Sequence, residues 1–294
     1  MEVDVKTTTL SKTATNWLES KQELPVFPFV EFESAENYHA KSKSGEFVSS
    51  HFLEDFRVKG PLFYHKKTNG EIPDKDSPAY LIGRAVHTFI LEGDERFDQD
   101  YEVTDGPIND KTGNPYGKET KTYKEWFASQ NKQIISVQDF ALVETMADSV
   151  RNHAFARKLL SRGVAESVVR AQIKGVSCQI RCDWLSSDYG IVDLKTCDDL
   201  DWFEYDAKKY GYYHQLAFYQ RVVFEASDRM PLVYIIAVEK KEPFRCGVWR
   251  ISDHTLETAS NENLDALSRL QECRDKKIWP TGYEELRTLE TKYL

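Results

Sequence analysis

Residues 176–197, VSCQIRCDWLSSDYGIVDLKTC, predict two β-strands joined by a turn. Residues 176–185 and 190–195 alternate with a period of two, and the Ser-Ser-Asp-Tyr-Gly segment between them is rich in turn-forming residues. In the first strand we expect one apolar face, made of Val176, Cys178, Ile180, Cys182 and Trp184. The opposite face is polar and carries Asp183 at its end.

The flanking sequence extends this pair of strands into a sheet with helices. A strand from Glu166 to Ile173 precedes it and joins it through Lys174-Gly175. The segments expected after it are a long helix at 202–226, strands at 232–239 and 245–251, and a helix at 256–276. This order predicts an α/β protein in which helices pack on a mixed β-sheet.

The first half of the chain is mainly helical by the same criteria. Helical apolar spacing appears at 47–63 and at 80–91, and residues 123–162 look largely helical, closing at Gly163. Residues 1–25 are polar with weak periodicity, which predicts a flexible arm. We therefore expect the arm and then one domain over residues 26–294, divided into a helical part (26–163) and a sheet with its helices (164–294).

Composition and charge narrow the class of protein. The chain has 294 residues, 40% of them hydrophobic, and a net charge of −9. Residues 1–150 carry 17 basic and 26 acidic side chains, whereas residues 151–294 carry 22 of each, so the acidic excess lies in the first half. No apolar run approaches the roughly 18 residues of a membrane helix, and no secretory signal or paired CxxC cysteines occur. These features predict a cytoplasmic protein that does not engage a membrane.

Asp193 and Lys195 stand two apart at the end of the predicted strand 190–195 and therefore project from one face. Asp183 precedes Asp193 by ten residues, the separation at which two antiparallel strands bring both carboxylates to one end of a sheet. Carboxylates that hold a divalent cation, beside a lysine that orients water, suit metal-assisted hydrolysis. A surface ion pair at a strand end is the alternative interpretation of Asp193 and Lys195.

Two helical segments add further candidates. Lys208, Tyr212, Gln215 and Tyr219 are spaced four, three and four residues apart, which places them on one stripe of the predicted helix 202–226. Such a stripe could contact phosphate or support a catalytic lysine, or it could be a half-buried packing face. His87 lies at the edge of an apolar helix face, where a core histidine is the alternative to a metal ligand.

Taken in order, these residues resemble a known family. Gly83 to His87 (GxxxH), Asp183, Asp193 to Lys195 (DxK) and Gln215 to Tyr219 (QxxxY) resemble the RecB-like branch of the PD-(D/E)XK nuclease superfamily. The segments GRAVHTFILEGDERFDQDYEV (83–103), IRCDWL (180–185), IVDLKT (191–196) and YGYYHQLAFY (210–219) are similar to the exodeoxyribonuclease VIII (RecE) nuclease domain. The resemblance covers about residues 47–294 and implies a restriction-endonuclease-like core. Cys182 departs from it, because the family usually has Pro there.

The resemblance also implies roles for individual residues. His87, Asp183, Asp193 and the backbone carbonyl of Leu194 would bind Mg²⁺ or Mn²⁺, and Lys195 would position the attacking water. Glu166 stands where the family carries a Glu. We expect it either to support the metal ligands without binding the ion itself or to bind a second metal ion. The residues expected to contact DNA or to support Lys195 are Arg181, Lys208, Gln215 and Tyr219.

The implied activity is 5′-to-3′ exonuclease digestion of linear double-stranded DNA to mononucleotides, which leaves 3′ single strands for recombination. The implied partners are a single-strand annealing protein of the RecT type and further copies of the chain, which would form a ring-shaped tetramer. The resemblance also implies that the protein is encoded by a phage or prophage and acts in a bacterial host. The motifs specify metal chemistry and not the requirement for an end, so a RecB-like endonuclease or a flap nuclease remains an alternative. An inactive DNA-binding or DNA-mimicking protein is a third, which the acidic first half favours.

Overall fold

The computed structural model of the protein describes residues 27–73 and 78–288. The predicted arm at 1–25 lies outside these ranges, and the division of the rest into two parts of one domain stays a prediction. Within the described ranges, no helix is long and apolar enough to cross a membrane.

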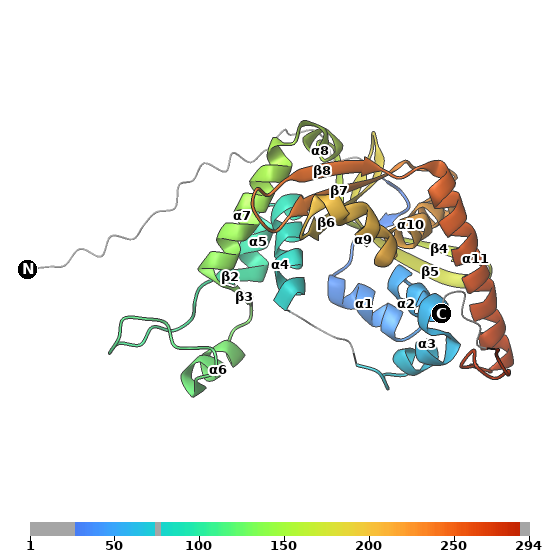
Figure 1. Ribbon diagram of the computed structural model, residues 1–294, viewed down its shortest axis with the longest axis horizontal. Helices are drawn as coiled ribbons and strands as arrows, with labels where there is room; N and C mark the ends of the chain where they lie inside the picture. Colours follow the sequence, from blue (N-terminus) through green and yellow to red (C-terminus); the bar gives the residue numbers. More distant parts are fainter. Residues whose placement is uncertain (1–26, 74–77, 289–294) are drawn as a thin grey trace, which may run out of the picture.

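A six-stranded mixed sheet forms the centre of the molecule (Figure 1). Its strands, in spatial order, are β1 (Val30–Glu31), β4 (Gly163–Ile173), β5 (Val176–Ser186), β6 (Gly190–Cys197), β7 (Val233–Glu239) and β8 (Cys246–Arg250). All neighbours are antiparallel except β6 and β7, which are parallel and are joined by a helical crossover. The predicted mixed sheet flanked by helices is thus confirmed.

Helices lie before, within and after the sheet. The α-helices are α1 (Ala35–Lys43), α2 (Ser50–Glu54), α3 (Pro61–Thr68), α4 (Pro78–His87), α5 (Asp94–Asp100), α6 (Lys121–Ala128), α7 (Val137–Asn152), α8 (Ala154–Leu159), α9 (Phe203–Lys209), α10 (Tyr212–Ser227) and α11 (Asp253–Lys276). Two π-helices, η1 (Asp55–Lys59) and η2 (Thr88–Glu92), continue α2 and α4, and a 3₁₀-helix, η3 (Leu200–Trp202), leads into α9. A small parallel pair, β2 (Tyr101–Val103) and β3 (Gln133–Ile135), accompanies α5 and α7.

Each face of the sheet carries its own hydrophobic core. Ile191 and Ile235 point into the core formed with α2, α10 and α11, whereas Val192 and Ile236 point into the core formed with α4, α7 and α8. This alternation is what consecutive residues of a strand must show. The helices therefore cover both faces, and β6 and β7 run through the middle of the protein.

The alternation of β5 changes at Asp183, and the predicted position of Trp184 is wrong. Cys182 packs in the core of α10 and α11, but Trp184 packs in the core on the opposite face. In the neighbouring strand β4, Glu166 has a positive φ of +50°. The residues on either side of Glu166 pair with those on either side of Asp183, but Glu166 and Asp183 are not themselves paired. A local backbone distortion of this kind re-aims side chains as a β-bulge does.

The predicted helix 202–226 is two helices, so that prediction is also wrong. Gly211 separates α9 from α10 in the left-handed conformation, with φ of +71°. This conformation is what favours glycine here; a Cβ atom would also lie 2.6 Å from Oε1 of Glu54, the mobile end of a side chain from α2. Lys208 consequently stands on a different helix from Gln215.

Residues 123–162 also differ in detail from the prediction. They contain β3 as well as α6, α7 and α8, and the last of these helices ends at Leu159. Gly163 does not close a helix but opens β4, where a Cβ would collide with the Trp184 ring and the Leu185 carbonyl. Crowding by the adjacent strand is thus the reason for glycine at this position.

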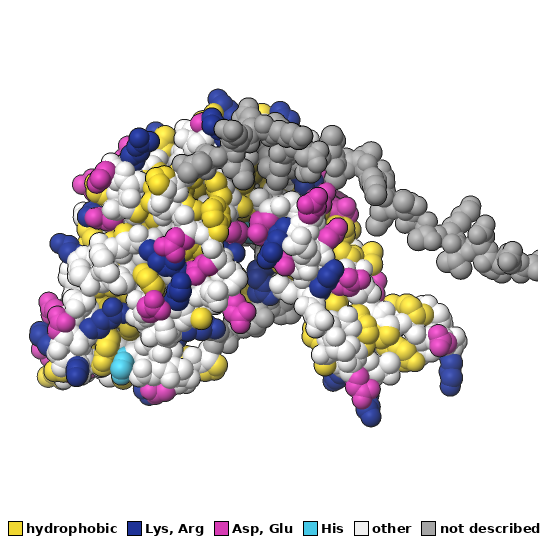
Figure 2. Space-filling model, turned by 180° about the vertical axis from the view of Figure 1, so that it is seen from behind, with side chains coloured by type: hydrophobic (Ala, Val, Ile, Leu, Met, Phe, Trp, Pro, Cys, Tyr) yellow, Lys and Arg dark blue, Asp and Glu magenta, His cyan; other side chains and the backbone are white. Residues whose placement is uncertain are grey.

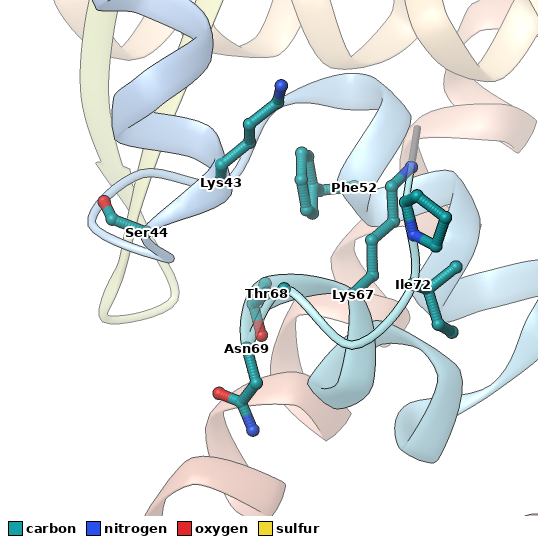
Figure 3. A pocket seen from close by; sticks show the side chains of 9 residues that line it. Lys43, Ser44, Phe52, Lys67, Thr68, Asn69 and Ile72 are labelled. Atoms are coloured by element: carbon teal, nitrogen blue, oxygen red, sulfur yellow. The ribbon is translucent and has the colours of Figure 1, made fainter. Parts of the chain in front are cut away.

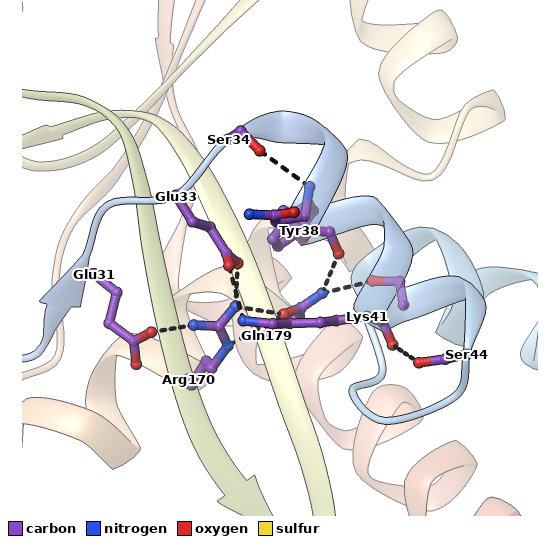
Figure 4. Close-up of polar contacts among 10 residues, drawn as sticks. Glu31, Glu33, Ser34, Tyr38, Lys41, Ser44, Arg170 and Gln179 are labelled. Atoms are coloured by element: carbon purple, nitrogen blue, oxygen red, sulfur yellow. Dashed lines mark hydrogen bonds and ion pairs between the residues drawn. The ribbon is translucent and has the colours of Figure 1, made fainter.

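Arg170 on β4 fastens the N-terminal segment to the sheet (Figure 4). Its guanidinium forms ion pairs with Glu31 and Glu33 and donates to Oε1 of Gln179 on β5. Gln179 is fully buried, and its amide donates to the Tyr38 carbonyl and to the Ser42 hydroxyl at 2.8 Å each. Because these buried polar groups have partners, α1 has a fixed place against β5.

Candidate active site

Three potential metal ligands converge where β4, β5 and α4 meet. Among the described residues, His87 at the end of α4, Glu166 on β4 and Asp183 on β5 each offer a ligand atom, and these atoms lie within 4.8 Å of one another. Nδ1 of His87 is 3.5 Å from Oδ2 of Asp183. The shared backbone distortion of β4 and β5 is what brings the two carboxylates to this point.

The end of β6 is joined to this group through Leu194. The paired residues of β5 and β6 end at Trp184 and Val192, and beyond them the Leu194 N–H donates to Oδ2 of Asp183 over 2.8 Å. His87 also forms a hydrogen bond with the Leu194 backbone, but burial outweighs it and lowers the pKa of His87. A neutral imidazole is the form that binds metal ions.

Beside this group, the buried Asp193 forms an ion pair with the partly exposed Lys195. Asp193 is 1% exposed, and Nζ of Lys195 lies 2.7 Å from its Oδ2, yet neither carboxylate oxygen receives a well-aligned hydrogen bond from the described residues. Burial raises the pKa of Asp193 to about 7, although Lys195 opposes the shift. Burial also disfavours the Lys195 ammonium, but Asp193 and Asp183 outweigh it, so the pKa of Lys195 is raised and the amine stays charged.

Helix α10 supports Lys195 from the other side. Nζ of Lys195 donates to Oε1 of Gln215 at 3.3 Å, and Nε2 of Gln215 donates to the Tyr219 hydroxyl, also at 3.3 Å. The same ammonium lies 4.8 Å from the centre of the Tyr212 ring, in a cation–π contact. Tyr219 is 5% exposed, so its hydroxyl lies inside the protein, where it supports Gln215.

Glu166 and Arg181 face each other across β4 and β5. Nε of Arg181 is 2.7 Å from Oε2 of Glu166, and both side chains are about one-fifth exposed. Burial raises the pKa of Glu166 to about 8, against the effect of Arg181 and with that of Asp183. A bound cation would offset this concentration of negative charge.

The structure does not bring every predicted residue to this centre. Lys208 is exposed on α9, before the break at Gly211, and no contact within the described ranges joins it to the other candidates. Asp193 lies outside the group of three converging ligands and is turned toward Lys195. Glu166, which the sequence indicated only as an accessory residue, belongs to that group, and its positive φ leaves no recognisable signal in the sequence.

Comparison with known families decides the class of this fold. Residues 52–291 match the model of a PDDEXK-like domain of unknown function (DUF3799). The chain belongs to this family. The match spans strands β4 to β8 of the sheet and every candidate site residue. The predicted resemblance to PD-(D/E)XK proteins is therefore confirmed.

A solved structure shares the PDDEXK-like fold of this chain. The crystal structure of a candidate exonuclease from Eubacterium rectale superposes with a TM-score of 0.62, covering 89% of this chain and 97% of the other, at 18% sequence identity. At that identity the likeness is one of fold. No curated protein matches the chain.

The converging residues fit a divalent metal ion. Two carboxylates and a neutral imidazole are ligands for Mg²⁺ and Mn²⁺, of which manganese accepts nitrogen more readily. The buried Asp193 oxygens, which lack well-aligned donors, add a further acceptor beside them. His87, Glu166 and Asp183 would hold the ion, with Asp193 or the Leu194 carbonyl completing its shell.

A separate cavity of about 470 Å³ opens between α1 and the end of α3 (Figure 3). Phe52 and Ile72 line it together with the stems of Lys43 and Lys67. None of the candidate site residues lines this cavity, so it is no part of the catalytic centre.

Proposed function

We propose that the protein is a metal-dependent nuclease that hydrolyses DNA phosphodiester bonds at the centre built from His87, Glu166, Asp183, Asp193 and Lys195. The observation that carries this proposal is the convergence of His87, Glu166 and Asp183 within 4.8 Å, beside a largely enclosed lysine whose pKa is raised. A bound divalent ion would supply Lewis-acid activation of water and of the phosphate.

The residues of the chain would divide the remaining work. Lys195 is anchored by Asp193, Gln215 and the Tyr212 ring, so its ammonium is held in one place at the metal group. From there it can orient an attacking water or stabilise the charge that develops on the phosphate. Asp183 fixes the end of β6 through the Leu194 N–H, and so it aligns Asp193 and Lys195 with the other ligands.

The finer proposal is a RecE-type exonuclease that digests linear double-stranded DNA from 5′ ends. Its support is the resemblance of the four ordered motifs, and the related fold occurs in a protein described as a candidate exonuclease. The same resemblance supports a RecT-like annealing partner, a ring-shaped tetramer and a place in phage or prophage recombination.

The test uses one linear duplex labelled at its 5′ or 3′ end and a covalently closed circle of the same sequence, each with Mg²⁺ or with EDTA. A 5′-to-3′ exonuclease releases the 5′ label at once as a mononucleotide, keeps the 3′ label on a long strand, and leaves the circle intact. Equal cleavage of circle and linear DNA would show an endonuclease and contradict the finer proposal. Cleavage that persists in EDTA would contradict metal dependence.

A further inference from the structure

Three large aromatic side chains stand exposed just beyond the end of β6. Trp202 is 65% exposed, Tyr205 62% and Tyr210 52%, although neighbouring Phe203 on the same segment is buried. The Trp202 and Tyr205 rings lie 6.4 Å apart, nearly perpendicular to each other. We call Trp202, Tyr205 and Tyr210 the α9 aromatic surface. A cluster of exposed aromatic rings is a feature that usually marks binding.

One member of the α9 aromatic surface, Tyr210, lies next to the ring that contacts the catalytic lysine. The Tyr210 ring lies 6.1 Å from the Tyr212 ring, and the Tyr212 ring is the one that faces Nζ of Lys195 at 4.8 Å. Figure 1 shows α9 following the end of β6, the strand that carries Lys195. A molecule held on these rings would therefore extend directly from the phosphodiester bond at Lys195.

Charges around α9 permit a polyanion to approach the end nearest the site. The acidic residues at its start are already paired: Asp199 and Asp201 with Arg245, and Glu204 with the Trp249 indole N–H. At its end, Lys208 and Lys209 form no ion pair with any residue of the described ranges, and Lys209 stacks over the Tyr210 ring, with Asp206 nearby. The surface thus offers rings for bases and two ammonium groups for phosphates.

We propose that the α9 aromatic surface binds the unpaired bases of a DNA strand whose phosphodiester backbone enters the site at Lys195. Bases within a duplex hide their faces in the stack, so exposed rings at this position suit a single strand. This inference rests on the proposed nuclease function and adds to it that the enzyme holds its substrate strand by the bases. The carboxylates along η3 and α9 make base stacking, more than phosphate contact, the source of affinity.

The test measures binding of a fluorescent 12-nucleotide oligothymidylate and of an abasic oligomer with the same number of phosphates, by anisotropy in EDTA. The probe is checked for integrity on a denaturing gel. Full-length wild type is compared with Trp202→Ala/Tyr205→Ala/Tyr210→Ala and with the control Tyr283→Ala, an aromatic residue that is 74% exposed elsewhere. Melting curves and light scattering confirm that each variant folds and keeps the wild-type size.

The wild type should bind oligothymidylate at least tenfold more tightly than the abasic oligomer, because stacking of a base on an aromatic ring is favourable and the abasic oligomer has no base to stack. The triple variant should lose that preference, and Tyr283→Ala should keep it. Equal binding of both oligomers by the wild type, or an unchanged preference in the triple variant, would overturn the proposal. So would a triple variant that changes only the oligomeric state, since the rings would then contact another copy of the chain.

Hydrolysis assays separate this proposal from the proposed function. A wild type that binds oligothymidylate through the rings but cleaves no DNA with Mg²⁺ would contradict the nuclease and leave the base-binding surface in place. A wild type that cleaves DNA while the triple variant keeps full base preference would overturn the surface alone.

Discussion

The Leu194 N–H donates to Oδ2 of Asp183 over 2.8 Å, and this hydrogen bond joins β5 to β6 beyond the last paired residues of the two strands. Asp183 therefore has two tasks, since its charge faces His87 and Glu166 while one oxygen fixes the backbone between Asp193 and Lys195. Substitutions can separate these tasks.

Asp183→Asn should keep the fold and lose the metal ion. The amide oxygen can still accept from Leu194, but the negative charge is gone, so Mn²⁺ affinity measured by calorimetry should fall about 100-fold or more. Asp183→Ala should lose the ion and also melt at a lower temperature than Asp183→Asn. Wild-type Mn²⁺ affinity in Asp183→Asn would remove Asp183 from the ligand set.

Gln215 should act on catalysis through Lys195. Gln215→Ala frees the ammonium from one of its anchors and should lower kcat about 10- to 100-fold with little change in KM, because misplacement of a catalytic group affects the chemical step. Tyr219→Phe removes only the hydroxyl that accepts from Gln215 and should have a smaller effect. If both variants raised KM and left kcat unchanged in steady-state assays, Gln215 would bind substrate and not position Lys195.

Glu239 on β7 should control stability in acid. Hydrogen bonds from Arg245 lower the pKa of this buried carboxyl to about 2 from its ordinary value of 4.5. A group with a lowered folded-state pKa contributes stability that is complete above pH 4.5 and is lost as the pH falls toward 2. In thermal melts between pH 6 and 2.5, the wild type should therefore lose stability steeply as the pH falls, by on the order of 2 kcal/mol. Glu239→Gln should lose less over the same range. If Glu239→Gln lost stability toward low pH as steeply as the wild type, this assignment would be refuted. It would also be refuted if the control Glu257→Gln, on the exposed face of α11, reduced the pH dependence as much as Glu239→Gln does.

Gly211 and Gly83 should respond oppositely to the same substitution. Gly211→Ala places a Cβ at φ of +71° and 2.6 Å from Oε1 of Glu54, so it should destabilise the protein by at least about 1 kcal/mol. Gly83 lies within α4, and a Cβ there meets no described atom within 4 Å, so Gly83→Ala should be neutral or stabilising by up to about 1 kcal/mol. Urea unfolding measures both changes, and a larger loss for Gly83→Ala would show that α4 is more crowded than the structure indicates.

The sequence was sufficient to predict the elements that carry regular periodicity. The strands around Asp193 and Lys195 follow from a period of two, and the proximity of Asp183 follows from its ten-residue separation across a short turn. The spacing of Gln215 and Tyr219 by one helical turn likewise predicted that they would act together, and the structure links them by a hydrogen bond.

What could not be predicted depends on backbone conformations that side-chain patterns do not encode. The opposite faces of Cys182 and Trp184 arise from the distortion at Glu166 and Asp183, where a strict period of two fails. The break between α9 and α10 occurs at Gly211, whose backbone is left-handed and which lies beside Glu54 of α2, more than 150 residues away in sequence. Both features are tertiary, and both affect which side chains reach the site.

The metal-dependent nuclease activity and the role of Lys195 are tested most directly by hydrolysis of a linear duplex. Wild type and Lys195→Ala are each assayed with Mg²⁺ and with EDTA, after melting curves have shown that the variant is folded. Lys195 carries no ligand atom of the metal group and touches the fold mainly through Asp193 and Gln215. We expect rapid cleavage by wild type with Mg²⁺, none in EDTA, and a rate at least about 100-fold lower for Lys195→Ala. A folded Lys195→Ala protein that cleaves at the wild-type rate would contradict this role of Lys195.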